Sequence, residues 1–321
     1  MGFAMRMPGA ACAYPRVAPD CSNTIAPLTT GYALQQLAYL ITGAALALVL
    51  ATQLFALHAK RDTGRSTQFH ILLLLFSASV LVALRSIDPL GLNDIVPYVV
   101  AVGMSDACTG LIETALIVML MFWIRVMEGD VQEYSPRVLW IGGVSISVLW
   151  LTSIAFPILQ WYYWDSGDHL IERIKISVAL LITLGMTVTV SIYGWKIHRR
   201  LEDIEDALSL EGDDYELALS SKQRGYSLSP TMPLPSPTPV RTPHGACCLR
   251  SKMLETLVGL HLVSGFVFVL QIYAIFRVET QNLSIVQCVT EGCTTAHMNM
   301  PIMPVAQVLG ICTGIWIFRH V

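Results

Sequence analysis

Charged residues are scarce in this 321-residue sequence. Asp, Glu, Lys and Arg together make up 13% of it, whereas soluble domains carry about 25%. Hydrophobic residues make up 54%, and the mean hydropathy is +0.58. No polar stretch is long enough to enclose a core of its own, which argues against a folded soluble domain. Apolar runs of the roughly 20 residues that cross a bilayer predict instead an all-α, multi-pass membrane protein with the lipid bilayer as its first partner.

Motifs for catalysis and for cofactor binding are also missing. The eight cysteines form no CxxC pair and no Cys/His cluster at ligand spacing. The sequence has no nucleophile elbow, no phosphate-binding loop and no HExxH metal motif. Residues 1–27 contain no continuous apolar stretch of the kind found in a cleavable signal peptide. We therefore expect no enzyme activity, no cofactor, no metal ion and no nucleic-acid partner.

Seven apolar runs predict seven membrane helices. The loops after the first, third and fifth runs are basic, and those after the second and fourth contain no Lys or Arg. Basic loops stay in the cytosol, so the N-terminus is predicted to be outside or luminal and the C-terminus cytosolic. In the last run, Gly310 and Gly314 permit close helix contact, which we expect inside the monomer rather than in a dimer. The predicted runs are residues 32–57, 69–87, 96–124, 138–160, 170–195, 252–276 and 302–318.

The chain divides into four parts along its length. Residues 1–30 show no helical period and are predicted to be a disordered luminal or extracellular tail. Residues 31–198 hold the first five membrane helices, and Pro157 is expected to kink or end the fourth of them. Residues 199–251 form an acidic and then Pro-rich cytosolic loop. Residues 252–321 hold the last two membrane helices, with a luminal loop at 277–301.

Two acids lie inside the third apolar run, Asp106 and Glu113. Their spacing of seven residues is about two helical turns and places both on one face. A membrane-embedded acid costs a few kcal/mol unless it faces protein or water, so this helix is predicted to lie inside the bundle. We predict an ion pair between Asp106 and Arg85, at the outer end of the second run. Glu113 is predicted to be neutral or hydrogen-bonded to a neighbour such as His261, and the two acids are either structural or a proton or cation pathway.

Three residues in the predicted luminal loop are candidates for modification or cross-linking. Asn282 begins an Asn-Leu-Ser sequon for glycosylation. Cys288 and Cys293 could form a disulfide in an oxidising lumen, although Cys12 and Cys21 lie on the same side and spacing alone does not fix the pairing.

Cytosolic candidates lie in and after the Pro-rich segment. Cys247 and Cys248, just before the sixth run, are juxtamembrane cysteines of the kind that is palmitoylated. Four hydroxyl residues each precede a proline, and phosphorylation there would change the charge of the loop. An unmodified flexible linker is the alternative reading of this segment. The four candidate phosphorylation sites are Ser229, Ser236, Thr238 and Thr242.

Short motifs in the membrane helices resemble a known family. The second run ends with Ala-Leu-Arg85-Ser-Ile, the third carries Asp106 and then Phe122-Trp123, and residues 195–200 read WKIHRR. This pattern resembles the tobamovirus-multiplication protein family of plants, which shares a seven-helix domain with an orphan-receptor-like lysosomal group in animals. The resemblance covers residues 68–318, but the Pro that the family has after its Asp is absent. It implies a vacuolar or lysosomal scaffold that binds small GTPases of the Arf-like or Rag type, without enzyme activity.

Three functions are compatible with the sequence. The first is an endomembrane protein that recruits cytosolic partners through residues 125–137 and 196–251. The second is a receptor coupled to G proteins, but the last run has no Lys for retinal, and the DRY and NPxxY motifs of rhodopsin-like receptors are missing. The third is a proton-coupled transporter using Asp106 and Glu113, although no inverted repeat is visible. We expect a vacuolar, lysosomal or other endomembrane location rather than the plasma membrane.

Overall fold

A computed structural model describes most of the membrane part of the chain. The helices are α1 (Tyr32–Ala59), α2 (Ser66–Leu84), α3 (Tyr98–Glu128), α4 (Pro136–Tyr163) and α7 (Ile302–Phe318), and Arg173–Lys196 forms a further helix. The described residues are 5–6, 12–29, 31–59, 66–128, 136–163, 170–171, 173–185, 187–189, 191–192, 194–196, 198–199, 202, 258–259, 261–262, 265–273, 275–276, 288, 290–293 and 302–318.

Five of these helices are long and apolar enough to cross a membrane: α1, α2, α3, α4 and Arg173–Lys196. Their length follows from long, predominantly apolar runs, in which isolated polar residues do not end the helix. α7 is also apolar but has 17 residues, and residues 265–273 are helical within the sixth predicted run. The described helices thus indicate an integral membrane protein, and the count of seven crossings stays a prediction.

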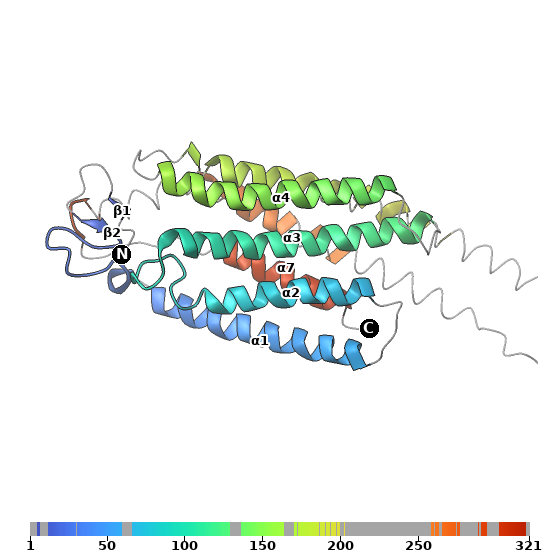
Figure 1. Ribbon diagram of the computed structural model, residues 1–321, viewed down its shortest axis with the longest axis horizontal. Helices are drawn as coiled ribbons and strands as arrows, with labels where there is room; N and C mark the ends of the chain where they lie inside the picture. Colours follow the sequence, from blue (N-terminus) through green and yellow to red (C-terminus); the bar gives the residue numbers. More distant parts are fainter. Residues whose placement is uncertain are drawn as a thin grey trace, which may run out of the picture. The chain divides into compact units, whose positions relative to one another are not determined.

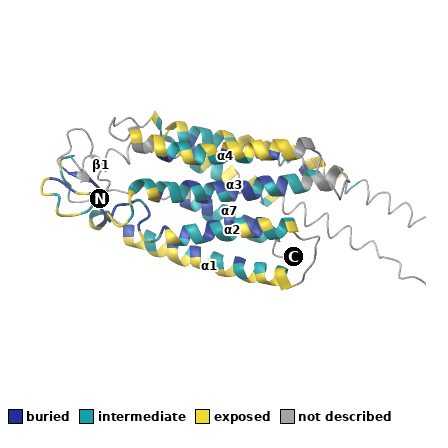
Figure 2. Cartoon of the chain, in the orientation of Figure 1, coloured by how far each residue is buried: buried dark blue, intermediate teal, exposed yellow. Residues whose placement is uncertain are grey.

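α3 is the central helix of the part formed by α1 to α4 and α7. Consecutive helices from α1 to α4 pack side by side, and α7 contacts α1, α2 and α3 (Figure 1). Large apolar side chains on α1 and α4 are exposed, as lipid-facing side chains would be, while residues of α3 such as Ala101 and Cys108 are fully buried (Figure 2). The interior position predicted from the acids of α3 is confirmed.

Glycines allow four of these helices, α1, α2, α3 and α7, to approach each other closely. A Cβ atom at Gly43 of α1 would lie 2.8 Å from the Cα of Ala83 in α2. On α7, a Cβ at Gly310 would lie 2.9 Å from Ile112 of α3, and one at Gly314 would overlap Leu75 of α2. The two glycines of α7 therefore serve contacts inside the monomer, as the sequence predicted.

Residues 12–29 form part of a folded cap at one end of the bundle, together with residues 88–96 and 288–293. Strand β1 (Met5–Arg6) pairs antiparallel with β2 (Ala13–Tyr14), and the short helix η1 (Ala26–Leu28) leads toward α1. The cap has its own apolar core, made by Tyr14, Val17, Ile25, Ala26, Tyr32, Leu92 and Cys288.

The predicted disordered tail is therefore wrong for residues 12–29. Lack of a helical period does not mean lack of structure, because this segment folds as an irregular loop held by its apolar side chains and a Cys12–Cys21 disulfide. A second disulfide joins Cys288 to Cys293, the pairing that the sequence suggested. The backbone N–H of Ala18 donates to the carbonyl of Cys288 at 3.3 Å, which ties the two disulfide-bonded segments together.

Asp88 organises the loop between α2 and α3 within the cap. Its fully buried carboxylate accepts hydrogen bonds from the Tyr32 hydroxyl at 2.5 Å and from the backbone N–H groups of Asn93, Ile95 and Val96 at 3.2–3.3 Å. Gly91 has a φ of +68° in this loop, a conformation that side chains disfavour. A buried carboxylate with four donors is well satisfied, so Asp88 fixes the path of the chain into α3.

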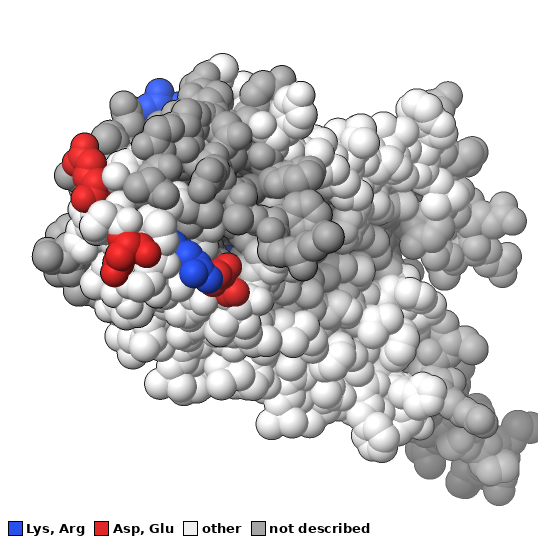
Figure 3. Space-filling view, turned by 60° about the vertical axis from the view of Figure 1, so that its left-hand side comes forward, with Lys and Arg blue, Asp and Glu red and all other residues white. Residues whose placement is uncertain are grey.

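Charged groups on the outside of the cap are weakly coupled to the fold. Arg16 and Asp94 form an exposed ion pair at 3.2 Å, and the Ser22 hydroxyl donates to Asp20 and lowers the pKa of that carboxyl. Burial, by contrast, raises the pKa of Tyr14 in the cap core. In the face drawn in Figure 3, the charged side chains gather at the cap end while the exposed flanks of the helices are uncharged.

α4 continues through Pro157 to Tyr163, so of the two predicted effects of this proline, a kink or the end of the helix, the end is excluded. Proline has no N–H and removes only the one backbone hydrogen bond to the residue four positions earlier. That residue is Ser153, whose carbonyl consequently has no i+4 donor within the helix.

Candidate functional site

A cavity of about 60 Å³ lies between α3, α4 and the Arg173–Lys196 helix. The polar side chains that line it come from all three helices, and the rest of its wall is apolar. Asp106, Thr109 and Glu113 follow each other along α3 at intervals of about one helical turn. This spacing lets all three residues line the same cavity. The cavity is lined by Asp106, Thr109, Glu113, Leu149, Thr152, Ser153, Phe156, Lys175, Val178, Ala179 and Ile182.

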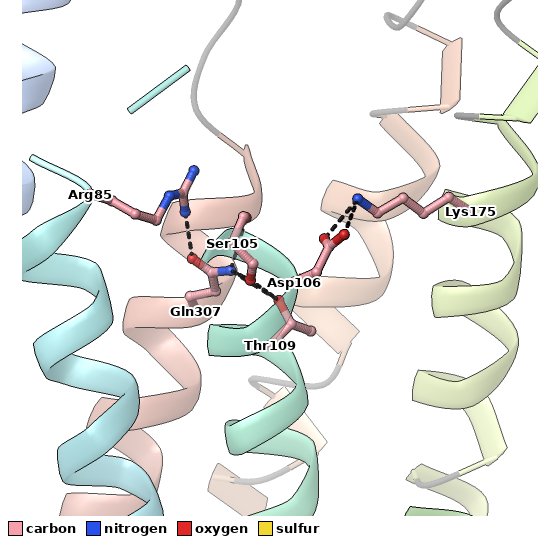
Figure 4. A network of polar contacts seen from close by, with 6 residues as sticks. All are labelled: Arg85, Ser105, Asp106, Thr109, Lys175 and Gln307. Carbon is pink, nitrogen blue, oxygen red and sulfur yellow. Dashed lines mark hydrogen bonds and ion pairs between the residues drawn. The ribbon is translucent and has the colours of Figure 1, made fainter. Parts of the chain in front are cut away.

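Asp106 forms its ion pair with Lys175, not with Arg85 as the sequence analysis predicted. The Lys175 Nζ lies 2.7 Å from Oδ1 of Asp106 and 2.7 Å from Oδ2. The carboxylate of Asp106 is 8% exposed, and a buried charge of this kind requires an opposite charge nearby. The correction has a geometric cause, because Asp106 projects from α3 toward the Arg173–Lys196 helix and away from Arg85 (Figure 4).

Arg85 instead bonds to α7. Its Nη1 donates to Oε1 of Gln307 at 3.1 Å, and its guanidinium lies 5.5 Å from the centre of the Tyr39 ring on α1, within the range of a cation–π contact. The Arg85 side chain is 4% exposed, and its Nε has no acceptor among the described residues.

Gln307 extends this contact into a network that joins three helices. Its Nε2 donates to the Ser105 carbonyl at 2.8 Å and to the Thr109 Oγ1 at 2.9 Å (Figure 4). Both ends of the Gln307 amide are therefore used, one toward α2 and one toward α3. Thr109 belongs to this network and also lines the cavity, so the network and the cavity meet at that residue.

Glu113 lines the cavity without a partner. No described residue forms a hydrogen bond or an ion pair with its carboxyl group. The suggested partner His261 makes a hydrogen bond with Ser191 within residues 188–261. Glu113 is thus the one acid of the predicted pair whose charge no described side chain compensates.

The hydroxyl groups around the cavity have their protons directed elsewhere. Thr109 donates to the Ser105 carbonyl at 3.2 Å, and Thr152 donates to the Leu149 carbonyl at 2.8 Å. A hydroxyl has one proton and two lone pairs, so neither group has a proton left to donate into the cavity, and one lone pair of Thr109 is already taken by Gln307. Below them, Thr114 donates to the Gly110 carbonyl and accepts from Trp150 Nε1 at 3.2 Å, which closes the contact between α3 and α4.

The remaining candidates from the sequence lie outside the described residues. They are the glycosylation site Asn282, the palmitoylation sites Cys247 and Cys248, and the phosphorylation sites Ser229, Ser236, Thr238 and Thr242. These stay predictions.

Sequence reasoning missed three residues of this region. Lys175 lies in an apolar run at a helical depth similar to that of Asp106, and matching the depths of opposite charges could have paired them. Gln307 gave a weaker signal, since a single amide in an apolar helix is compatible with many partners. From the sequence, Asp88 is recognisable only as a loop residue. The backbone N–H groups that donate to its carboxylate are positioned by a loop conformation that no sequence motif predicts.

Comparisons of the chain with protein-family models, with curated proteins and with solved structures find no match.

Proposed function

We propose that the protein is a seven-helix endomembrane protein that recruits cytosolic proteins, small GTPases among them, through the loops after its third and fifth helices. The observation that carries the proposal is the cap. It brings residues 12–29, 88–96 and 288–293 together at one end of the helices, with Ala18 bonded to Cys288 and Ala26 to Leu92.

The cap supports seven crossings by parity. Residues 96 and 288 lie at the same end, so an even number of crossings separates them. Three of these crossings would be made by α3, α4 and the Arg173–Lys196 helix. An even number then requires a fourth crossing between residues 197 and 287. α1 and α2 precede this group and α7 follows it, which brings the total to seven.

The disulfides support the orientation. Disulfides form and persist in oxidising compartments, so the cap end would be luminal or extracellular. Residues 125–137 and 196–251 would then lie in the cytosol, in agreement with their basic residues. A protease-protection experiment that placed Cys247 and Val321 on opposite sides of the membrane would overturn this topology.

The location and the partners come from the resemblance to the tobamovirus-multiplication family. Arg85, Asp106 and the Phe122-Trp123 pair support that resemblance, and it implies a vacuolar or lysosomal membrane and small GTPase partners. The proposal includes no enzyme activity.

Co-purification with the full-length protein tests the proposal. Residues 222–248 would be replaced by a Gly/Ser segment of the same length, which keeps the reach of the loop and removes its prolines and phosphorylation sites. We expect cytosolic proteins, with GTP-loaded small GTPases among them, to co-purify with the wild type and to be lost from the variant. Recovery of the same proteins from both would count against the proposal.

A receptor-like protein is the second candidate, favoured by the polar network beside the cavity. The Arg85–Gln307–Thr109 network joins α2, α7 and α3, and a shift of these helices would connect the luminal end to the cytosolic end. Ligand-dependent activation of a G protein would promote this candidate. Transport by way of Asp106 and Glu113 is not part of the proposal, because Lys175 already holds Asp106 in an ion pair.

A further inference from the structure

The charges around the cavity do not cancel. Asp106 and Glu113 of α3 face it with two carboxyl groups, and Lys175 supplies one positive charge that is already paired with Asp106. α4 contributes only hydroxyl and apolar side chains to the wall. Arg85 is bonded to Gln307 on the α7 side of the bundle. An ionised Glu113 therefore leaves one negative charge in the cavity wall that no described side chain compensates.

The neutral polar groups of the wall add to this imbalance in the same sense. Thr152 has its proton directed to a backbone carbonyl and offers lone pairs, while Thr109 donates to the Ser105 carbonyl and accepts from Gln307. Ser153 also lines the cavity, and its carbonyl has no i+4 donor because Pro157 follows four residues later. The wall is mostly apolar, and its few neutral polar groups are oxygen acceptors, which suit a cation rather than an anion.

The size of the cavity limits the cation. One water molecule needs roughly 10–15 Å³ of such space, so 60 Å³ holds one small ion with a few waters. A divalent ion would reverse the charge of the cavity, and Ca²⁺ takes about six to eight oxygen ligands. A bulky organic ammonium group would not fit.

We propose that the cavity is a binding site for one small monovalent metal cation, with the Glu113 carboxylate and the oxygens of Thr152 and Ser153 as its ligands. Lys175 neutralises Asp106, so the ion is held by the charge of Glu113 alone. The proposal goes beyond the recruitment of cytosolic partners and does not depend on it.

The test is the melting temperature of the purified full-length protein in NaCl and KCl, each compared with choline chloride at equal ionic strength and constant pH. A ligand that binds only the folded state raises the melting temperature with its concentration. We expect the rise to grow with the logarithm of the salt concentration and to reach about 5 °C with Na⁺ or K⁺ at 100 times the dissociation constant. The rise should be absent in Glu113→Gln and should need higher salt in Thr152→Val.

Matched variants separate binding from folding. Asp94→Asn removes an acid at the exposed cap surface, and Ser147→Ala removes a hydroxyl of α4 outside the cavity. Both should keep the full response to salt. Equilibrium binding of radioactive ²²Na⁺ to wild type and Glu113→Gln supplies a readout that does not depend on melting.

Three outcomes overturn the proposal. The first is a melting temperature that is the same in NaCl, KCl and choline chloride. The second is a salt response that persists unchanged in Glu113→Gln together with unchanged ²²Na⁺ binding. The third is a stability that depends on pH through Glu113 but not on either metal ion, which would make a proton the sole occupant.

Discussion

The two faces of α3 differ in how their polar atoms are matched. Toward α2 and α7, side chains such as Cys108 and Ile112 are buried, and the polar groups of Ser105 and Thr109 receive hydrogen bonds from Gln307. Toward α4 and the Arg173–Lys196 helix, a cavity remains, and Glu113 lines it without a hydrogen-bond or ion-pair partner among the described residues. The first face therefore contributes stability through satisfied polar groups, and the second face is where the cation proposed above would bind.

The largest effect is expected at the ion pair of the second face. Lys175→Met would leave the Asp106 carboxylate buried without its counter-charge, at a cost of about 3–5 kcal/mol. The double variant Lys175→Met/Asp106→Asn should recover most of the loss, because no unpaired charge remains. Thermal unfolding of the purified protein measures both.

Arg16→Met is the control for this prediction. This substitution breaks the Arg16–Asp94 ion pair, whose N···O distance is 3.2 Å and whose side chains are about half exposed at the cap surface. The protein should lose only about 0–1 kcal/mol of stability. Equal losses of stability in Lys175→Met and Arg16→Met would show that burial does not strengthen the Asp106–Lys175 ion pair.

The next effect concerns the network of the first face. Gln307→Leu removes the acceptor of Arg85 and the donor to α3 while keeping the side-chain volume similar, and we expect a loss of about 1.5–3 kcal/mol. Gln307→Glu keeps an acceptor for Arg85 and should lose less. If both variants melt together with the wild type, the network does not stabilise this face.

Close packing on the first face predicts a smaller effect. A methyl group at Gly314 would overlap Leu75, so Gly314→Ala should destabilise the protein by roughly 1 kcal/mol, the overpacking cost less the gain in helix propensity. Gly103→Ala is the matched control, since a Cβ there meets nothing within 4 Å, and it should be neutral or stabilising. Thermal unfolding of the two variants compares them, and the reverse order would contradict the packing described here.

The smallest effect is expected at the cavity wall. Ser153 makes no hydrogen bond through its side chain to a described residue, and Ser153→Ala should change stability by less than about 0.5 kcal/mol. Thr114→Val, one helical turn below, leaves the Trp150 N–H without its acceptor and should cost about 1–3 kcal/mol. Chemical or thermal unfolding of the two variants would distinguish Ser153, which lines the cavity, from Thr114, which holds α3 and α4 together.

The sequence predicted the helices well and their polar contacts poorly. The first predicted run, 32–57, corresponds to α1 (Tyr32–Ala59), and the third, 96–124, to α3 (Tyr98–Glu128). These boundaries follow from hydropathy, which acts locally and can be read one residue at a time. Pro157 does not end α4, since neighbouring helices support a membrane helix that has lost one hydrogen bond.

Partners across the bundle could not be read in the same way. Arg85 and Asp106 were paired because both lie near the same end of their helices, but the rotation of each helix about its axis decides which neighbour a side chain meets. That rotation is set by packing, as in the contact of Gly314 with Leu75, and a single sequence does not encode it visibly. The cap shows the same limit, because the fold of residues 12–29 depends on contacts with residues far along the chain.

The cap also sets an order of events during biosynthesis. The N-terminal segment of the cap, residues 12–29, is synthesised early. The residue that completes the cap core, Cys288, is made some 260 residues later. At roughly 5–20 residues per second, the N-terminal segment of the cap waits for tens of seconds before Cys288 is made. Each disulfide closes within its own segment, so it is the apolar core of the cap and the Ala18–Cys288 hydrogen bond that form last, and both require the intervening helices to have brought the two segments to the same end of the bundle.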